Sequence, residues 1–269
     1  MNLLRIEMRR ALRRRAVRVL ILVALVGCVL LGVIAFSTSS GETLAELRRG
    51  ENPAIMANWW KPGTADGSLL ISFLFLIFGG IIGGATVAGA EWRSGTITSV
   101  LTWEPRRVRL HLTRTAACGI LAAVIGFALQ VLFLAASLPS VFANGSTDGI
   151  AASWWGSLLL AMTRASLVTA LGAMVAVALA TLGRNTAFAL VAAFAWVGVI
   201  EGLIRGLKPG LAQYLWAENV ATVVPWVQME DVQFVRSPVV ALTTLMVYAT
   251  AFIAVSAAAF ARRDIAGAS

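Results

Sequence analysis

Six apolar runs of seventeen or more residues constrain this chain more than any other feature of its sequence. They cover residues 17–36, 68–90, 116–138, 155–182, 187–203 and 239–261. About 20 helical residues cross a hydrocarbon core of roughly 30 Å, so each run is a candidate transmembrane helix. Hydrophobic residues make up 59% of the chain and charged residues only 13%. We therefore predict one all-α integral membrane domain over residues 1–269, with six transmembrane helices and no separate soluble domain.

The distribution of basic residues predicts how the chain is oriented. An N-terminus in the cytoplasm places fifteen Arg and Lys residues in cytoplasmic segments and six in outer segments. Cytoplasmic loops of membrane proteins carry an excess of Lys and Arg, so both termini are expected inside. The first apolar run is longer than the 7–15 apolar residues of a signal peptide, and we expect it to be retained. The expected location is the plasma membrane, as a multi-pass protein.

Residues 1–16, ahead of the first run, have a helical pattern. Leu4, Met8 and Ala11 recur at helical spacing, and arginines occupy the other faces. This pattern predicts a basic amphipathic helix on the inner leaflet. The alternative is a solvated basic tail that only sets the topology.

A glycine-rich motif lies inside the second apolar run, where Gly79, Gly80, Gly83 and Gly84 surround two isoleucines. A dinucleotide-binding fingerprint needs a preceding strand and an exposed turn, which an apolar span does not offer. The two overlapping small-xxx-small patterns instead allow another helix to approach closely. We expect packing within the chain, and the alternatives are a dimer interface or a face of a substrate pathway.

Apart from Arg18 at the start of the first span, the charged residues within the predicted spans are Arg164 and Glu201. An arginine near the bilayer centre costs about 2.5 to 3.5 kcal/mol on translocon scales, so Arg164 is expected to face the protein interior with a partner. Glu201 in the next span is the candidate partner, directly or through water. The alternatives are that Arg164 faces a central pathway, snorkels outward or bonds backbone carbonyls.

The sequence offers little for catalysis. It contains no Gly-Lys pair, so the phosphate-binding loop of an ATPase is missing. His111 is the one histidine, and the isolated Cys28 and Cys118 form neither a disulfide framework nor a zinc motif. We predict that the chain is not an enzyme and holds no metal or cofactor. Its formal charge of +9 lies beside apolar runs, which argues against nucleic-acid binding.

Residues 91–107 join the second and third spans on the predicted cytoplasmic side. They mix charged residues with Ile97, Val100, Leu101 and Trp103, and Pro105 closes the segment. This composition predicts a short amphipathic helix. Such a helix either lies on the lipid surface or docks a cytoplasmic partner.

The same segment resembles the first cytoplasmic loop of the permease subunits of ABC type-2 exporters, especially of the actinobacterial branch. The residues that carry this resemblance are Gly89-Ala90-Glu91-Trp92, Gly95-Thr96 and Leu101-Thr102-Trp103-Glu104-Pro105-Arg106-Arg107. The turn at 183–185 (Gly-Arg-Asn) and the ending at 260–265 (Phe-Ala-Arg-Arg-Asp-Ile) are also similar to that family. The chain departs from it in the basic run at 105–109, where many relatives have Ser and a single Arg.

The resemblance implies a type V, ABCG-like fold, in which two six-helix permeases surround a central pathway and each docks on an ATPase subunit. It also implies that residues 91–107 are the coupling helix, and that ATP and Mg bind to the partner ATPase. The docking residues would then be Glu91, Trp92, Arg93, Gly95, Thr96, Trp103, Pro105, Arg106 and Arg107.

The expected function is therefore that of the permease subunit of an ABC exporter, working as a homo- or heterodimer in the lipid membrane. The sequence does not specify the substrate, and amphipathic small molecules, peptides and lipids all remain open. Two other classes also remain open: an ion-coupled secondary transporter that uses Arg164 and Glu201, and a non-transporting scaffold or assembly factor.

Overall fold

The computed structural model describes residues 3–50, 52–64, 66–231 and 233–262. Six helical segments in these residues are long and apolar enough to cross a membrane. They are α2 (Arg15–Ser39), α4 (Leu69–Arg93), α6 (Arg107–Asn144), α7 (Ala152–Gly183), the composite segment Thr186–Leu207 and α11 (Pro238–Arg262). The composite segment consists of α8 (Thr186–Ala195), the π-helix η2 (Trp196–Ile200) and α9 (Glu201–Leu207). The prediction of an all-α chain with six helices long and apolar enough to span a membrane is confirmed, and its orientation stays a prediction.

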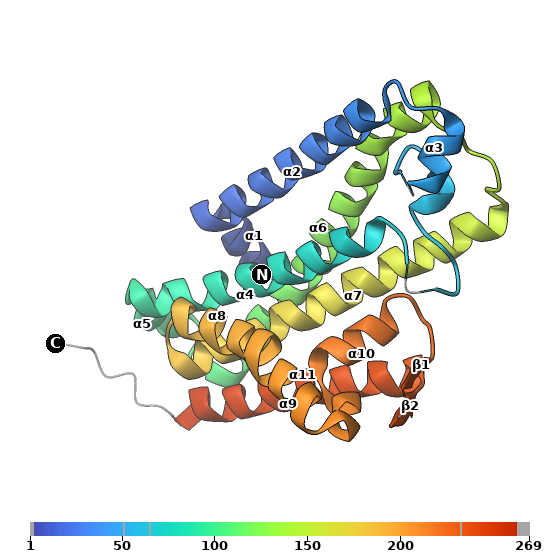
Figure 1. Cartoon of the computed structure of the whole chain (residues 1–269). Coiled ribbons are helices and arrows are strands. Elements are labelled where there is room, and N and C mark those ends of the chain that lie inside the picture. Colours follow the sequence, from blue (N-terminus) through green and yellow to red (C-terminus); the bar gives the residue numbers. More distant parts are fainter. Residues whose placement is uncertain (1–2, 51, 65, 232, 263–269) are drawn as a thin grey trace.

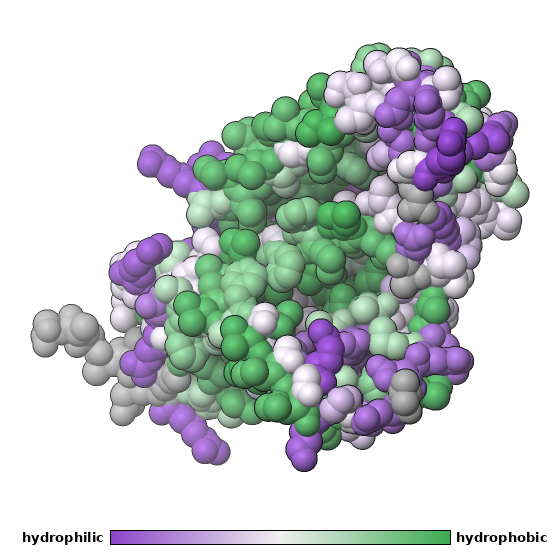
Figure 2. All heavy atoms as spheres, in the orientation of Figure 1, coloured by the Kyte–Doolittle hydropathy of each residue, from purple (hydrophilic) through white to green (hydrophobic). Residues whose placement is uncertain are grey.

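The shorter elements lie at the two ends of the bundle (Figure 1). α1 (Leu3–Arg13) and α5 (Thr96–Trp103) lie at the end where α4 and α11 finish and α6 begins, and we call this the basic end. The opposite end holds α3 (Leu44–Arg49), η1 (Met56–Asn58), η3 (Pro209–Tyr214), α10 (Trp216–Val223) and the hairpin of β1 (Met229–Asp231) and β2 (Phe234–Arg236). Figure 2 shows hydrophilic residues gathered at both ends and a hydrophobic band between them.

Helix α7 is the centre of the bundle, and α4, α6, α8 and α11 all pack against it. Its contact with α4 depends on two glycines of the predicted motif. A Cβ added at Gly84 would lie 2.3 Å from the Ala173 carbonyl oxygen, and one at Gly80 would lie 2.7 Å from Thr169 Cγ2. Helices approach this closely only where side chains are absent. Gly80 and Gly84 therefore pack within the chain.

Helix α2 stands apart from this arrangement. It packs mainly along α6 and touches α4 much less, so it stands off from the rest of the bundle in Figure 1. The contact with α6 is close at Gly32, where an added Cβ would lie 2.3 Å from the Ala136 carbonyl oxygen. Helix α1 also packs on α6, and it places Glu7 and Ala11 in the interior. A helix thus forms in the predicted N-terminal segment, whereas its location on a lipid surface stays a prediction.

The structure corrects the boundaries of the predicted helix at 91–107. Helix α4 continues to Arg93, the chain turns at Gly95, and α5 is only eight residues long. Gly95 has φ 66°, a left-handed conformation that interrupts a helix and that glycine adopts at little cost. Helix α6 then begins at Arg107, well before the apolar run predicted from residue 116. Some of its polar residues are buried within the bundle: His111 is 1% exposed, and its Nε2 hydrogen-bonds with Ser256 Oγ at 2.8 Å.

Candidate functional site

Helix α5 lies at the basic end with one side against the bundle and the other in solvent. Ile97 is 3% exposed and anchors the inner side, whereas the Trp103 side chain is 89% exposed. The Thr98 hydroxyl donates a hydrogen bond to the Gly95 carbonyl at 2.9 Å, which closes the first turn. An indole is a large apolar group, and its exposure next to a packed helix face marks a site where another surface can bind.

The predicted docking residues fall into two groups in the structure. The exposed group is Arg93, Gly95, Thr96, Trp103, Pro105 and Arg106, and Arg107 is half-buried. Glu91 is buried instead, and Trp92 is half-buried. Glu91 is 1% exposed, so the prediction that it contacts a partner protein is corrected. Glu91 lies on the last turns of α4, and its side chain points toward α1 and α6.

Trp92 is occupied by contacts within the chain. Its ring meets the Phe260 ring edge-on, with 6.0 Å between the centroids, and the Arg184 guanidinium lies 5.5 Å from its centroid. Arg184 has φ 54° in the tight turn between α7 and α8. Phe260 belongs to the predicted C-terminal motif, of which residues 263–265 lie outside the described residues.

Five charged side chains form a cluster at the basic end, and we call Glu7, Arg10, Arg14, Glu91 and Arg114 the charge cluster. Arg10 and Arg14 are half-buried, and the other three are buried. The Glu91 carboxylate pairs with Arg10 at 3.2 Å, with Arg14 at 2.5 Å and with Arg114 at 2.6 Å. The Glu7 carboxylate pairs with Arg10 at 2.7 Å and with Arg114 at 3.3 Å. The side chains of Glu7, Glu91 and Arg114 are each less than 5% exposed. Two carboxylates thus hold three guanidinium groups at the protein interior.

Each charged side chain of the charge cluster would be costly in free energy to bury without a partner. Removing a charge from water is unfavourable unless a partner of opposite charge compensates for it. Burial holds the pKa of the Arg14 guanidinium below its usual value, and the neighbouring Glu91 carboxylate opposes that shift. Arginine nevertheless stays protonated in proteins, so Arg14 remains a cation in this cluster.

The charge cluster joins segments that are far apart in the sequence. Glu7 and Arg10 come from α1, Arg14 lies between α1 and α2, Glu91 is near the end of α4 and Arg114 is near the start of α6. Glu91 is five residues before the first residue of α5. The charge cluster therefore connects the last turns of α4, which precede α5, to α1 and α6.

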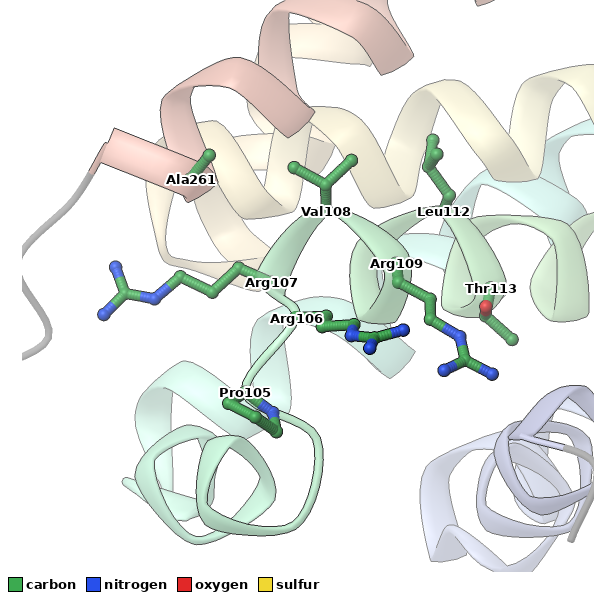
Figure 3. A pocket seen from close by; sticks show the side chains of 8 residues that line it. All are labelled: Pro105, Arg106, Arg107, Val108, Arg109, Leu112, Thr113 and Ala261. Carbon is green, nitrogen blue, oxygen red and sulfur yellow. The ribbon is translucent and has the colours of Figure 1, made fainter.

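A shallow depression of about 710 Å³ lies beside α5, at the start of α6. Its lining includes Arg106, Arg107, Arg109 and Ala261 of α11. Figure 3 shows Arg106 and Arg109 pointing to one side, whereas Arg107 points away from both. Arg109 also pairs with Glu104 at 3.5 Å. The three arginines therefore do not converge on one anion, and they extend the basic surface around α5.

The structure does not bring Arg164 and Glu201 together. Glu201 is fully buried, and its carboxylate accepts hydrogen bonds from Trp196 Nε1 at 2.8 Å, Trp216 N at 2.7 Å and Ala217 N at 3.0 Å. The last two are the first amides of α10, so Glu201 caps that helix.

Arg164 has other partners. Its Nε donates to the Leu160 carbonyl at 3.0 Å, and its guanidinium lies 5.2 Å from the centroid of the Trp226 ring. The hypothesis of a direct Arg164–Glu201 pair is therefore wrong, and the alternative of a bond to a backbone carbonyl describes Arg164.

Gly79 and Gly83 have a different environment from Gly80 and Gly84. All four line an apolar cavity of about 660 Å³ between α2, α4, α6 and α7, which we call the α2–α4 crevice, but only Gly80 and Gly84 are also packed closely against α7. A Cβ added at Gly79 would meet nothing within 4 Å, and one at Gly83 would meet only Leu20 Cδ2 at 3.7 Å. These two glycines therefore leave space open rather than packing against a helix of the same chain.

Comparisons with known proteins add no identification, because no protein-family model and no curated protein matches the chain. Within the described residues, no group of three or more His, Cys, Asp or Glu side chains is arranged to hold a metal ion.

The charge cluster was not predicted from the sequence. Of its five members, only Glu91 was identified as a site residue. One signal was present, because Glu7 is the only acidic residue among the first eighteen.

Proposed function

We propose that the chain is the permease subunit of an exporter driven by a separate ATPase, of the ABC type-2 class. The observation that carries the proposal is α5, a short helix with an exposed indole, which follows the end of α4 where Glu91 of the charge cluster lies. The basic end would lie in the cytoplasm of a cell with this protein in its plasma membrane. ATP and Mg would bind to the partner ATPase.

The ATPase surface that fits α5 follows from the side chains that α5 presents. Trp103 is the anchor, since tryptophan is among the residues that contribute most to protein interfaces. Arg93 and Arg106 are exposed on either side of the helix. The complementary surface would therefore be a groove with an apolar slot for the indole and acidic residues at its rim.

Movement of the ATPase would reach the membrane through α4. Because Glu91 and α5 are separated by only a few residues, a push on α5 turns the end of α4. The charge cluster then transmits that motion to α1 and α6, because the pairs of Arg114 with Glu7 and Glu91 are buried and costly to break. Two permease subunits, identical or related, would enclose the pathway in this proposal.

Two other functions have less support. An ion-coupled transporter needs ionisable groups in the membrane that exchange protons or ions. Glu201 is instead held by three N–H donors, and Arg164 lies against Trp226. A scaffold without transport activity also fits an exposed α5, and it differs from the exporter in the identity of the partner.

A photo-crosslinking amino acid in place of Trp103, incorporated in the native cells, tests the proposal. We expect the main adduct to be an ATPase with a phosphate-binding loop. The control position is Leu207, which is 75% exposed at the end of α9 and would lie outside the cell. Adducts from position 103 that contain no ATPase, or an equal yield of ATPase adduct from position 207, would contradict the proposal.

A further inference from the structure

The α2–α4 crevice is long as well as apolar. It is lined on α2 from Val17 to Ile34, and on the other side by residues of α4 and α6. At 1.5 Å of rise per residue this stretch of α2 is about 25 Å long. The crevice therefore follows most of a hydrocarbon core that is roughly 30 Å thick. Figure 2 shows the corresponding hollow within the hydrophobic band.

Helices α2 and α4 leave this space open because α2 is held to the bundle mainly near its two ends. Helix α2 is held to α6 at Gly32, near one end, and the charge cluster holds Arg14 at the other end. Between these two points an added Cβ at Gly27 on α2 or at Gly79 on α4 would meet nothing within 4 Å. The lining is dominated by aliphatic and aromatic side chains. An apolar space of this kind excludes water, and an apolar chain that fills it gains the dispersion contacts that the walls otherwise lack.

Charge distinguishes the two ends of the crevice. At the basic end it is lined by Ala11 and Val17, and Arg13, Arg15 and Arg18 are exposed on the same stretch of chain. At the opposite end the last residues of α2, 34–39, carry no charged side chain. No lining residue of the crevice is charged, so the arginines flank its basic end rather than line it. Arginines beside a membrane span attract anionic lipid, by about 1 kcal/mol for each residue near the surface.

We propose that the α2–α4 crevice binds one acyl chain of an anionic phospholipid, with the lipid phosphate at the basic end beside the arginines of residues 13–18. The lipid fills the space that Gly27, Gly79 and Gly83 leave open, and it joins α2 to α4 where the two helices do not touch. This inference does not depend on the proposed transport function, because it requires only a chain in a bilayer.

The test uses the full chain in nanodiscs with phosphatidylglycerol that carries a diazirine in the middle of one acyl chain. After photolysis, mass spectrometry maps the adducts. We expect them to concentrate on the crevice-facing residues of α2 and α4. A Gly79→Leu/Gly83→Leu variant should reduce these adducts at least about fivefold, since its side chains occupy the cavity. The matched control, Gly156→Leu on α7, adds the same side chain at an exposed glycine with nothing within 4 Å and should leave the adducts unchanged.

A Gly27→Leu variant is measured beside the double variant, because it fills the crevice from α2 without altering α4. Three results would each overturn the inference: adducts spread evenly over the exposed apolar residues, adducts that persist in both filled variants, and equal yields from phosphatidylcholine with the same acyl chain. A crevice occupied by a second copy of the chain would also overturn it, and this would appear as a disulfide between the Cys28 residues of two copies in place of lipid adducts.

Discussion

Replacing Glu91 by Gln removes the charge at the centre of the charge cluster and hardly changes the side-chain volume. In the structure this carboxylate pairs with three guanidinium groups, and Arg114 among them is only 3% exposed. The variant leaves three cations with Glu7 as the single remaining carboxylate of the cluster. We expect Glu91→Gln to be among the more destabilising single substitutions in the basic end.

The size of the effect follows from burial. Breaking a buried ion pair by removing one partner costs about 3–5 kcal/mol. A chain of this size loses about 2–4 °C in Tm for each kcal/mol, so the expected decrease is on the order of 10 °C. The matched control is Glu104→Gln. Glu104 pairs at 3.5 Å with an exposed Arg109, and a pair of that kind contributes about 0–1 kcal/mol.

The assay is thermal unfolding of purified variants in one detergent, followed by tryptophan fluorescence. Arg114→Gln and the double variant with Glu91→Gln complete a cycle. Residues in one network show interaction free energies of about 0.5–3 kcal/mol, so the double variant should lose less stability than the sum of the two single losses. A Glu91→Gln variant with the Tm of the wild type, or strictly additive losses, would refute the role given to the cluster.

Three further predictions use other parts of the structure. Gly84→Ala should destabilise the protein by about 1–3 kcal/mol, because the added methyl group overpacks against α7. Gly79→Ala should leave the thermal stability within about 1 kcal/mol of wild type. Equal Tm values for the two variants would contradict the conclusion that, of these two glycines, only Gly84 packs against α7. Glu201→Gln should lower stability by about 1–3 kcal/mol and speed amide hydrogen exchange in α10, and unchanged exchange there would argue against the cap. With the two native cysteines removed, a cysteine at Ser40 should react with an impermeant reagent in intact cells and one at Ser94 should not; the reverse pattern would overturn the predicted orientation.

The six spans could be predicted from the sequence because length and apolar composition are local properties of each segment. The prediction was least accurate where polar residues are buried. His111 and Arg114 interrupt the hydrophobic pattern, and yet they lie inside α6, because their partners come from α11, α1 and α4. The same limit explains the overlong helix at 91–107, since the left-handed conformation of Gly95 is a property of the folded chain.

The candidate site could be predicted only in part. The composition around Trp103 indicated a surface helix, and its exposure agrees with that interpretation. Glu91 was assigned to the surface, because two of its arginine partners are 77 and 81 residues earlier and the third is 23 residues later on α6, and no local pattern reports such contacts. For Arg164 and Glu201, the helical rise estimates only their separation along the bundle. It does not say which way each side chain faces, and the two residues have separate partners in the structure.

The proposed function is tested most directly by ATP hydrolysis in the complex that the chain forms. The protein is purified from its native cells in a mild detergent, as wild type, as Trp103→Ala and as Leu207→Ala. Trp103 is exposed, so its replacement should change the stability of the chain by less than about 0.5 kcal/mol. Loss of an interface anchor of about 2 kcal/mol weakens binding roughly 30-fold. We predict that ATP hydrolysis co-elutes with the wild type and with Leu207→Ala and is lost from Trp103→Ala. Wild-type protein that elutes with no ATPase activity, or activity retained in full by Trp103→Ala, would contradict the proposal.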